Sequence, residues 1–252
     1  MGGNNLPFLK NINFKWDSVE DKNVYPFNIS AIKGIQSIKL DSNVTFFIGE
    51  NGSGKSTLLE AIAINCGFGI VGGGKSNLLS GYEDKNSLDS IIKLSWMPKV
   101  KSGFFLRSET FYSFANYIDK LADDPFNIKQ EVYGAYGGKS LHEQSHGEAF
   151  MSLFLNRFSH KGIYFLDEPE AALSPQRQLA FMRIIWELER KGIAQFIIAT
   201  HSPILMAYPG AKIYNFDENP IKKVQFEETE HYKITKDFLN DKDRFLKHLL
   251  MY

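Results

Sequence analysis

The chain has 252 residues, of which 43% are hydrophobic and 23% charged, values that are ordinary for a soluble globular protein. Lysine and arginine together number 29, as do aspartate and glutamate, so the overall basic excess typical of a dedicated DNA-binding protein is absent. Cys66 is the only cysteine, which excludes an internal disulfide and argues against a cysteine-based zinc site.

The first third of the chain is typical of β-structure followed by one helix. Aromatic and β-branched residues predict strands at 14–16, 27–32 and 35–40, and the continuous apolar run 44–48 predicts a strand buried on both faces. A glycine-rich turn follows, and then a helix that carries Leu58, Leu59, Ile62 and Ile64. Residues 67–90 are rich in glycine, serine, asparagine and aspartate, which predicts a surface excursion.

The remaining two thirds alternate between strands and helices. The runs IIKLSWM and GFFL predict a hairpin, and TFYSFANYIDKL predicts a helix. Buried strands are predicted in GIYFLDEPE and AQFIIATHSP, with a helix between them that has Ser174 at its N-cap and Pro175 at its first position. One or two short amphipathic helices complete the tail.

This order predicts an α/β fold in a single domain, 1–252, with a mixed or antiparallel β lobe and a parallel-sheet core. The expected parts are a nucleotide-binding core at 1–66 and 160–220, a helical lobe at 100–160 and a C-terminal helical tail at 221–252.

Residues 49–56, GENGSGKS, match the phosphate-loop pattern G-x-x-x-x-G-K-[ST] between a predicted strand and a predicted helix. Glycines let backbone N–H groups converge on phosphate oxygens, and the helix N-terminus adds positive potential. Lys55 is expected to reach the β- and γ-phosphates, and the Ser56 hydroxyl to bind Mg²⁺. The candidate nucleotide-binding residues here are Gly49, Asn51, Gly52, Ser53, Gly54, Lys55, Ser56 and Thr57.

Two acids follow the predicted strand in IYFLDEPE. Asp167 ends the strand, where a Walker B aspartate would hold Mg²⁺, and Glu168 stands where a general base would polarise the attacking water. The alternative is that both acids only cap the next helix. The guanine-reading N-K-x-D motif of GTPases is absent from the sequence, and small-molecule kinases need no second acid, so ATP hydrolysis is favoured.

Four segments, GENGSGKSTLLEAIA, SHGEAF, YFLDEPEAALSP and IIATHSP, occur in the order and context of ABC-type ATPase heads. The chain resembles the soluble SMC/RecF-like branch of that family and its small stand-alone bacterial ATPases. The resemblance extends over nearly the whole chain. It implies a P-loop NTPase fold of the ABC type, with a helical signature subregion and with ATP and Mg²⁺ as cofactors.

The family also implies a head-to-tail homodimer that encloses two ATP molecules, each between the phosphate loop of one subunit and the signature helix of the other. Ser145, Gly147 and Glu148 would then contact the nucleotide in trans, although His146 and Glu148 replace the family's usual glycine and glutamine. A helix N-terminus attracts an anion by roughly 0.3–1 kcal/mol per charge. That is too little to hold a dimer alone, but enough to make dimerisation depend on the γ-phosphate.

Further positions match the family less directly. His201, at the end of its strand, resembles the switch histidine that senses the γ-phosphate, the alternative being a strand-end histidine satisfied by its neighbours. Residues 171–174 resemble the loop that crosses the dimer interface. Tyr25 stands where transporters place an adenine-stacking aromatic, unless it is a core tyrosine, and Glu109 could replace the expected glutamine near the metal.

The segment 142–146, HEQSH, also fits the zinc-protease pattern H-E-x-x-H, which requires both histidines on one face of a helix. Glycines upstream prevent a helix from extending backwards, and Ala149 and Ser152 break the metzincin continuation. The zinc interpretation accounts for none of the other motifs, so we favour the ATPase signature.

Three functions are consistent with this sequence. The first is a cytoplasmic ATPase whose ATP-driven homodimerisation acts on a separate effector, such as a nuclease, a toxin or a nucleic-acid complex, in DNA repair or phage defence. No apolar run approaches the roughly 18–20 residues of a membrane span, so we expect no membrane insertion. The alternatives are the nucleotide-binding subunit of a membrane ABC transporter and a repair ATPase that binds DNA directly.

Overall fold

The computed structural model describes residues 7–69, 87–157 and 161–250, and is built on a six-stranded sheet of order β5-β6-β7-β3-β8-β9. All neighbouring pairs are parallel except β8 and β9. Its strands are β3 (Val44–Ile48), β5 (Gly103–Arg107), β6 (Gly162–Asp167), β7 (Ala194–Ala199), β8 (Lys212–Asn215) and β9 (Lys222–Val224). β3, β6 and β7 are buried along their whole length, which explains their uninterrupted apolar sequences.

A second sheet has three antiparallel strands in the order β2-β1-β4. They are β1 (Leu9–Phe14), β2 (Ser37–Lys39) and β4 (Ile92–Trp96). The predicted combination of an antiparallel lobe and a parallel core is therefore confirmed.

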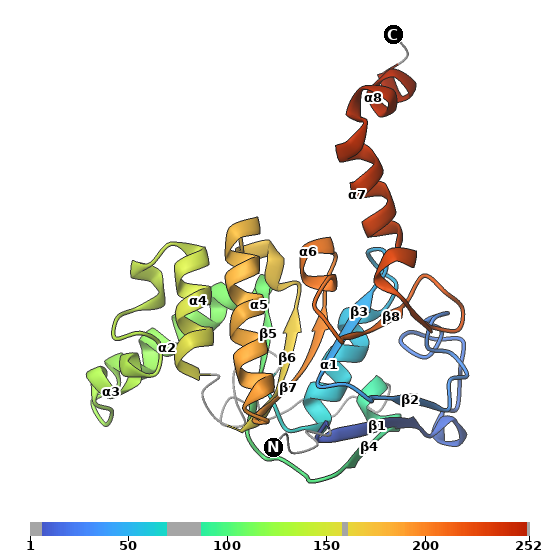
Figure 1. Ribbon diagram of the computed structural model, residues 1–252. Coiled ribbons are helices and arrows are strands. Elements are labelled where there is room, and N and C mark those ends of the chain that lie inside the picture. The colour runs from blue at the N-terminus through green and yellow to red at the C-terminus, as the bar shows by residue number, and fades with distance from the viewer. Residues whose placement is uncertain (1–6, 70–86, 158–160, 251–252) are drawn as a thin grey trace.

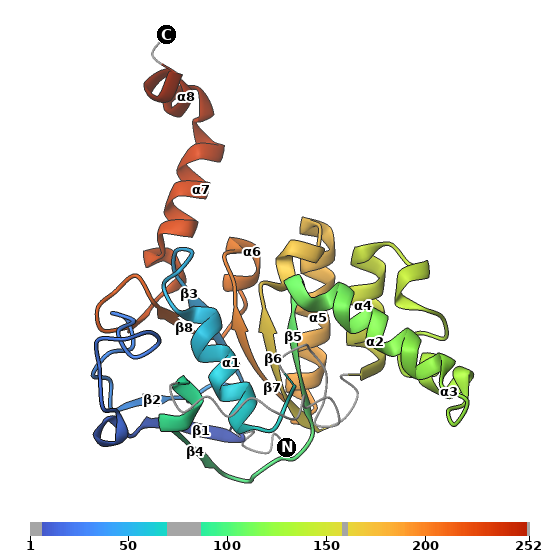
Figure 2. The same cartoon turned by 180° about the vertical axis from the view of Figure 1, so that it is seen from behind.

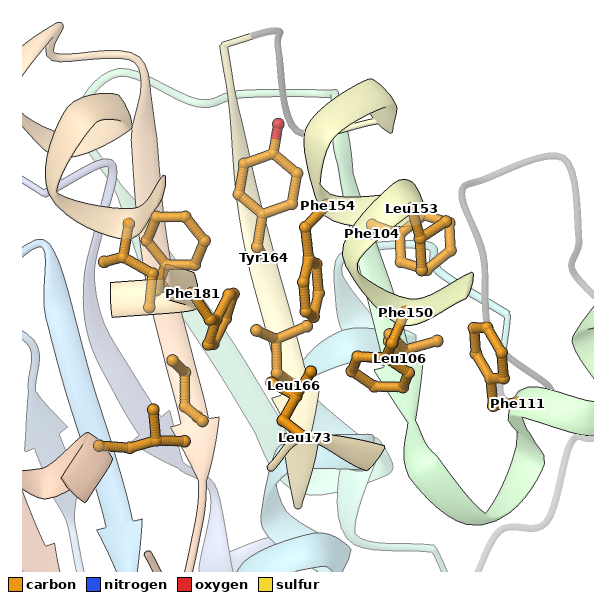
Figure 3. Close-up of a cluster of buried hydrophobic side chains, with 14 of the residues drawn as sticks. Phe104, Leu106, Phe111, Phe150, Leu153, Phe154, Tyr164, Leu166, Leu173 and Phe181 are labelled. Atoms are coloured by element: carbon orange, nitrogen blue, oxygen red, sulfur yellow. The ribbon is translucent and has the colours of Figure 1, made fainter. Parts of the chain in front are cut away.

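Helices cover the two faces of the large sheet. Helix α1 (Lys55–Asn65) and the small sheet share one buried cluster with the side chains of Phe47, Phe105 and Phe165. The opposite face is covered by α2 (Phe111–Asp123), α4 (His146–Arg157), α5 (Pro175–Arg190) and α6 (Pro203–Met206), while α3 (Lys129–Gly134) packs on α2. Figure 3 shows the aromatic centre of this second cluster, between α4 and the strands β5 and β6.

Three predicted details of the strands were wrong. The expected hairpin does not form, because β4 joins the small sheet whereas β5 pairs in parallel with β6. Phe104, Phe105 and Leu106 are all buried, a pattern that fits a core strand and not a surface hairpin. β5 thus lies in the core sheet, within the range 100–160 that was expected to be the helical lobe.

The strand predicted at 27–32 is also absent, because this stretch forms successive turns with local hydrogen bonds such as Lys33 N–H to Ile29 O at 2.8 Å. Phe27, Ala31 and Ile32 are buried there at a spacing that suits turns. β1 also ends at Phe14, before the predicted strand 14–16 is complete.

The C-terminal tail forms two helices, α7 (Glu230–Asn240) and α8 (Lys242–Leu250), which we call the arm. The arm stands away from the body, at the edge of the sheet where α1 begins (Figures 1 and 2). In the described part of the chain no helix is both long and apolar enough to cross a membrane.

Candidate functional site

The phosphate loop joins the end of β3 to the start of α1. Gly49, Gly52 and Gly54 adopt positive φ angles of 137°, 81° and 100°, which side chains other than glycine rarely accept. A Cβ atom on Gly54 would also lie 2.6 Å from the side chain of Ile29. The tight turn therefore requires glycine, as the motif predicted.

Lys55 lies over this loop. Its Nζ donates to the carbonyl oxygens of Gly49 at 2.7 Å and of Glu50 at 2.8 Å. Burial lowers the pKa of Lys55, although Glu168 and other acids nearby favour its charged form. The loop also presents Ser53 Oγ, which is buried and makes no hydrogen bond. A buried donor without a partner fits a phosphate oxygen, so the loop suits the triphosphate that its sequence predicts.

The residues expected to bind Mg²⁺ lie together. Ser56 Oγ donates to Asp167 Oδ1 at 2.9 Å, which brings the first turn of α1 to the end of β6. A hydroxyl and a carboxylate are oxygen ligands of the kind that Mg²⁺ prefers, and phosphate oxygens usually complete its shell. Glu109, in the turn Ser108–Thr110, lines the same cavity of about 380 Å³ as Ser56, Asp167 and Glu168.

Arg107 contributes to this site and was not predicted. Its Nε is 2.8 Å from Asp167 Oδ2, and its Nη2 is 2.8 Å from Glu60 Oε2. Burial opposes the charge of Arg107, but the two carboxylates outweigh it and raise the pKa of the guanidinium. The Walker B aspartate thus has a hydroxyl on one oxygen and a cation on the other.

Glu168 and His201 face each other across the ends of β6 and β7. Glu168 has φ 51° and ψ 52°, a left-handed conformation that costs a residue with a side chain roughly 1–2 kcal/mol. Its Oε1 lies 3.3 Å from His201 Nε2, an ion-pair distance without the geometry of a hydrogen bond. The backbone N–H of His201 donates to Glu170 Oε1 at 2.5 Å, which fixes the turn after β7.

The signature segment forms the start of α4. Ser145 precedes the helix, and its N–H donates to Glu148 Oε2 at 3.0 Å, as in half of a capping box. The hydrogen bond from Ser145 lowers the pKa of Glu148. Ser145, His146 and Glu148 are all exposed. This helix end is open to solvent, and His146 lines the same cavity as Ser56 and Asp167 of its own chain.

Gly147 faces inward instead. A Cβ atom there would lie 2.0 Å from Arg177 Nη1 and 3.0 Å from the carbonyl oxygen of Ala172. The start of α4 therefore packs on the loop 171–174, which the sequence predicted to cross a dimer interface. Arg177 also approaches Glu148, at 3.7 Å. The two segments expected at that interface thus lie side by side.

Tyr25 is not a core tyrosine. Its side chain is 67% exposed, and its hydroxyl lies 3.0 Å from Thr57 Oγ1 in the first turn of α1. A ring anchored beside the phosphate loop and open to solvent is suitably placed for an adenine base.

The two histidines of the H-E-x-x-H pattern belong to different elements. His142 lies in the turn Leu141–Glu143 and contacts Asn116 Oδ1 at 2.9 Å. His146 begins α4, and its ring packs edge-on against Phe111. A zinc protease needs both on one helix face, so this geometry does not suit one.

Two more residues at the site escaped the sequence analysis. Asp217, just after β8, accepts the N–H of Glu50 through Oδ1 at 2.7 Å. His231, in the first turn of α7, approaches His201. No local motif marks either residue, since only the folded chain brings them to the phosphate loop.

A phosphate loop between a parallel strand and a helix, a Walker B acid pair and an ordered signature helix together define a P-loop ATPase of the ABC type. Family comparison agrees with this assignment. Residues 149–207 match the family described as "AAA domain, putative AbiEii toxin, Type IV TA system", and residues 23–64 match "P-loop containing region of AAA domain".

Individual proteins show the same similarity. A "Putative ABC transporter ATP-binding protein" of Methanothermobacter marburgensis is 28% identical over 215 residues, 79% of this chain and 74% of its own length. The tungstate uptake system ATP-binding protein TupC of Peptoclostridium acidaminophilum is 26% identical over 183 residues, 69% of this chain and 81% of its own. The structure of cbiO1 from Clostridium perfringens, part of the ABC transporter complex cbiONQ, shares the fold, with TM-score 0.51, 18% identity and coverage of 98% and 100%.

The chain is thus an ATPase of the AAA/ABC type, a class that uses ATP with Mg²⁺. The predicted fold class and enzyme class are confirmed.

Proposed function

We propose that ATP joins two copies of this chain head to tail, and that the closed dimer acts on a separate effector protein. Each nucleotide would lie between the phosphate loop of one copy and the start of α4 of the other. ATP hydrolysis would then release the dimer and reset the effector.

Within one chain the proposed roles follow from position. Lys55 and the loop amides would bind the phosphates, Ser56 and Asp167 would hold Mg²⁺, and Glu109, which lines the same cavity, would be a further ligand. The metal, when bound, would neutralise developing charge on the phosphates. Glu168 orients and deprotonates the attacking water, a contribution of about 10²–10⁴ in rate, and His201 donates from Nε2 to the γ-phosphate.

The observation that carries the proposal is the exposed start of α4. Ser145 stands just before a helix whose N-terminal dipole attracts anions, and its side chain is open to solvent. The same edge of the molecule holds the phosphate loop (Figures 1 and 2). A two-fold pairing of that edge would bring each α4 end to the other copy's γ-phosphate.

Several effectors fit the family evidence. The family description that matches 149–207 refers to a toxin of a toxin–antitoxin system, which supports a toxin among the proposed effectors. The similar proteins named as transporter subunits support a second candidate, a nucleotide-binding subunit of a membrane complex. Co-purification with an integral membrane protein would favour that candidate, whereas an ATP-stimulated, salt-sensitive shift of duplex DNA would favour a direct role in repair.

The test uses Glu168→Gln, which removes the base but keeps the shape of the side chain. We expect this variant to bind ATP and to elute as a dimer with Mg·ATP and as a monomer with ADP, as measured by size-exclusion chromatography with light scattering. Lys55→Ala should bind no nucleotide. A Glu168→Gln protein that binds ATP yet stays monomeric at every concentration would contradict the proposal.

The in-trans contact has its own test. Ser145→Arg, introduced into the Glu168→Gln protein, should leave ATP binding intact and prevent dimerisation, because a bulky cation would block the partner's phosphate. Ser37→Arg is the matched control, since Ser37 is exposed at the start of β2, on the small sheet. Equal dimerisation of both double variants would show that α4 does not contact the nucleotide.

A further inference from the structure

The first turn of α7 ties the arm to the nucleotide site. Thr229 is buried and caps α7, because its Oγ1 accepts the N–H of Tyr232 at 3.3 Å and donates to the Phe226 carbonyl at 2.8 Å. His231 follows, and its Nε2 lies 3.4 Å from Nδ1 of His201, with ring centroids 5.5 Å apart. From residue 233 to the end of α7 the arm is exposed. The arm is therefore anchored beside His201.

The contact at Nδ1 determines what Nε2 of His201 can do. A neutral imidazole has one nitrogen that donates and one that accepts. Nε2 faces the carboxylate of Glu168 at 3.3 Å, and in the proposed reaction it also faces a phosphate oxygen. Both groups only accept, so a hydrogen bond from His201 to either of them requires the proton on Nε2. In the neutral ring Nδ1 is then the acceptor and is free to receive a donor.

His231 can supply that donor when its own Nε2 carries the proton, because this atom lies 3.4 Å from Nδ1 of His201. Burial, reinforced by the neighbouring His201, lowers the pKa of His231, which favours the neutral form of this ring. Fixing a histidine tautomer through the hydrogen bond of its second nitrogen is an established way to orient a reactive imidazole.

We propose that His231 is a positioning residue that holds His201 in its Nε2–H tautomer, so that the seating of the arm controls the γ-phosphate sensor. The inference rests on the proposed role of His201. The arm would then regulate the rate of ATP hydrolysis. An effector that displaces the first turn of α7 would break the contact between His231 and His201 and slow hydrolysis.

The test compares two substitutions at 231. His231→Gln keeps an N–H donor at about the reach of Nε2, whereas His231→Phe keeps the ring volume and loses the donor. We expect His231→Phe to lower kcat about ten-fold with little change in the KM for ATP, and His231→Gln to retain most activity. His248→Phe is the matched control, since His248 is exposed on α8 of the same arm.

A spectroscopic measurement separates positioning from loss of structure. In ¹⁵N-histidine spectra of the full chain, the His201 signals are assigned by their absence in His201→Ala. Wild-type protein and His231→Gln should show a protonated Nε2 and an unprotonated Nδ1, and His231→Phe should show a mixture of tautomers. An unchanged His201 spectrum in His231→Phe would overturn the inference, as would equal losses of kcat in His231→Gln and His231→Phe.

The double variant His201→Ala/His231→Phe distinguishes a failure of the positioning role of His231 from a failure of the proposed role of His201. If His201 senses the γ-phosphate, His201→Ala lowers kcat, and adding His231→Phe lowers it no further. A His201→Ala protein with normal kcat would refute the proposed role of His201 itself. A low kcat in His201→Ala, lowered again ten-fold by His231→Phe, would refute only the positioning role of His231.

Discussion

Asp167 is the residue on which the metal site depends, and in this structure one of its two partners is a cation. Ser56 occupies Oδ1 and Arg107 occupies Oδ2, so both carboxylate oxygens are hydrogen-bonded. The Asp167 side chain is 4% exposed, and a buried carboxylate without partners is costly. Arg107 therefore stabilises the carboxylates of both Asp167 and Glu60 before any metal binds.

The first prediction concerns Arg107→Ala. Losing an ion pair that is largely buried should lower the free energy of unfolding by about 2 kcal/mol in the absence of nucleotide, as measured by urea denaturation. The loss should shrink when Mg·ATP is added, because Mg²⁺ brings another cation to Asp167.

Lys222→Ala provides the control for this prediction. The ion pair of Lys222 with Glu218 is exposed, at 62% and 44%, so its loss should cost less than about 1 kcal/mol. Equal effects of the two variants would contradict the role given to Arg107.

Site residues that belong to a local sequence pattern could be predicted, whereas site residues outside such a pattern could not. The residues of the phosphate loop and Asp167-Glu168 were found because strand, turn and helix signals surround them. Arg107 lies opposite Asp167 only through the register of β5 on β6, sixty positions away in the chain. His231 meets His201 through the course of the tail, which the sequence indicated only as amphipathic helix.

At the scale of elements, burial on both faces made β3, β6 and β7 predictable. It did not reveal which sheet a strand joins, so β4 and β5 were wrongly paired. Too many strands were predicted in the N-terminal part of the chain, because short apolar runs occur in turns as well as in strands. Helix α5 was predicted correctly because Ser174 and Pro175 mark its start.

The packing of α4 on α5 leads to the second prediction. Phe154 of α4 is 1% exposed, stacks on Phe181 of α5 with centroids 4.3 Å apart, and contacts Phe150 edge-on (Figure 3). Phe154→Ala should lower the free energy of unfolding by about 3–5 kcal/mol, because it removes a buried ring and leaves a cavity. Urea denaturation would measure the loss.

Leu155→Ala is the control on the same helix. Leu155 is 62% exposed, so the free energy of unfolding should change by less than about 1 kcal/mol. Similar losses at both positions would mean that α4 is not held by this aromatic contact.

At the scale of the whole molecule, the elements with chemical roles gather at one edge. The phosphate loop, the ends of β6 and β7, the start of α4 and the base of the arm all lie there (Figures 1 and 2). The carboxyl ends of parallel strands are the common position of ligand sites in α/β folds. This gathering could be predicted from strand order, but the seating of the arm on His201 could not.

The last prediction follows from the division of each proposed site between two copies. Lys55→Ala inactivates only the phosphate loop, and Ser145→Arg inactivates only the start of α4. A dimer of either variant alone would carry the defect in both sites, so each protein alone should be inactive. In a mixed dimer, the intact loop of one copy meets the intact helix end of the other. Neither variant should dimerise with itself, so equal mixing should yield mixed dimers with one intact site of two and restore up to about half of the wild-type ATPase rate. Phosphate release against mixing ratio measures this, and a mixture as inactive as its components would favour sites that are complete within one chain.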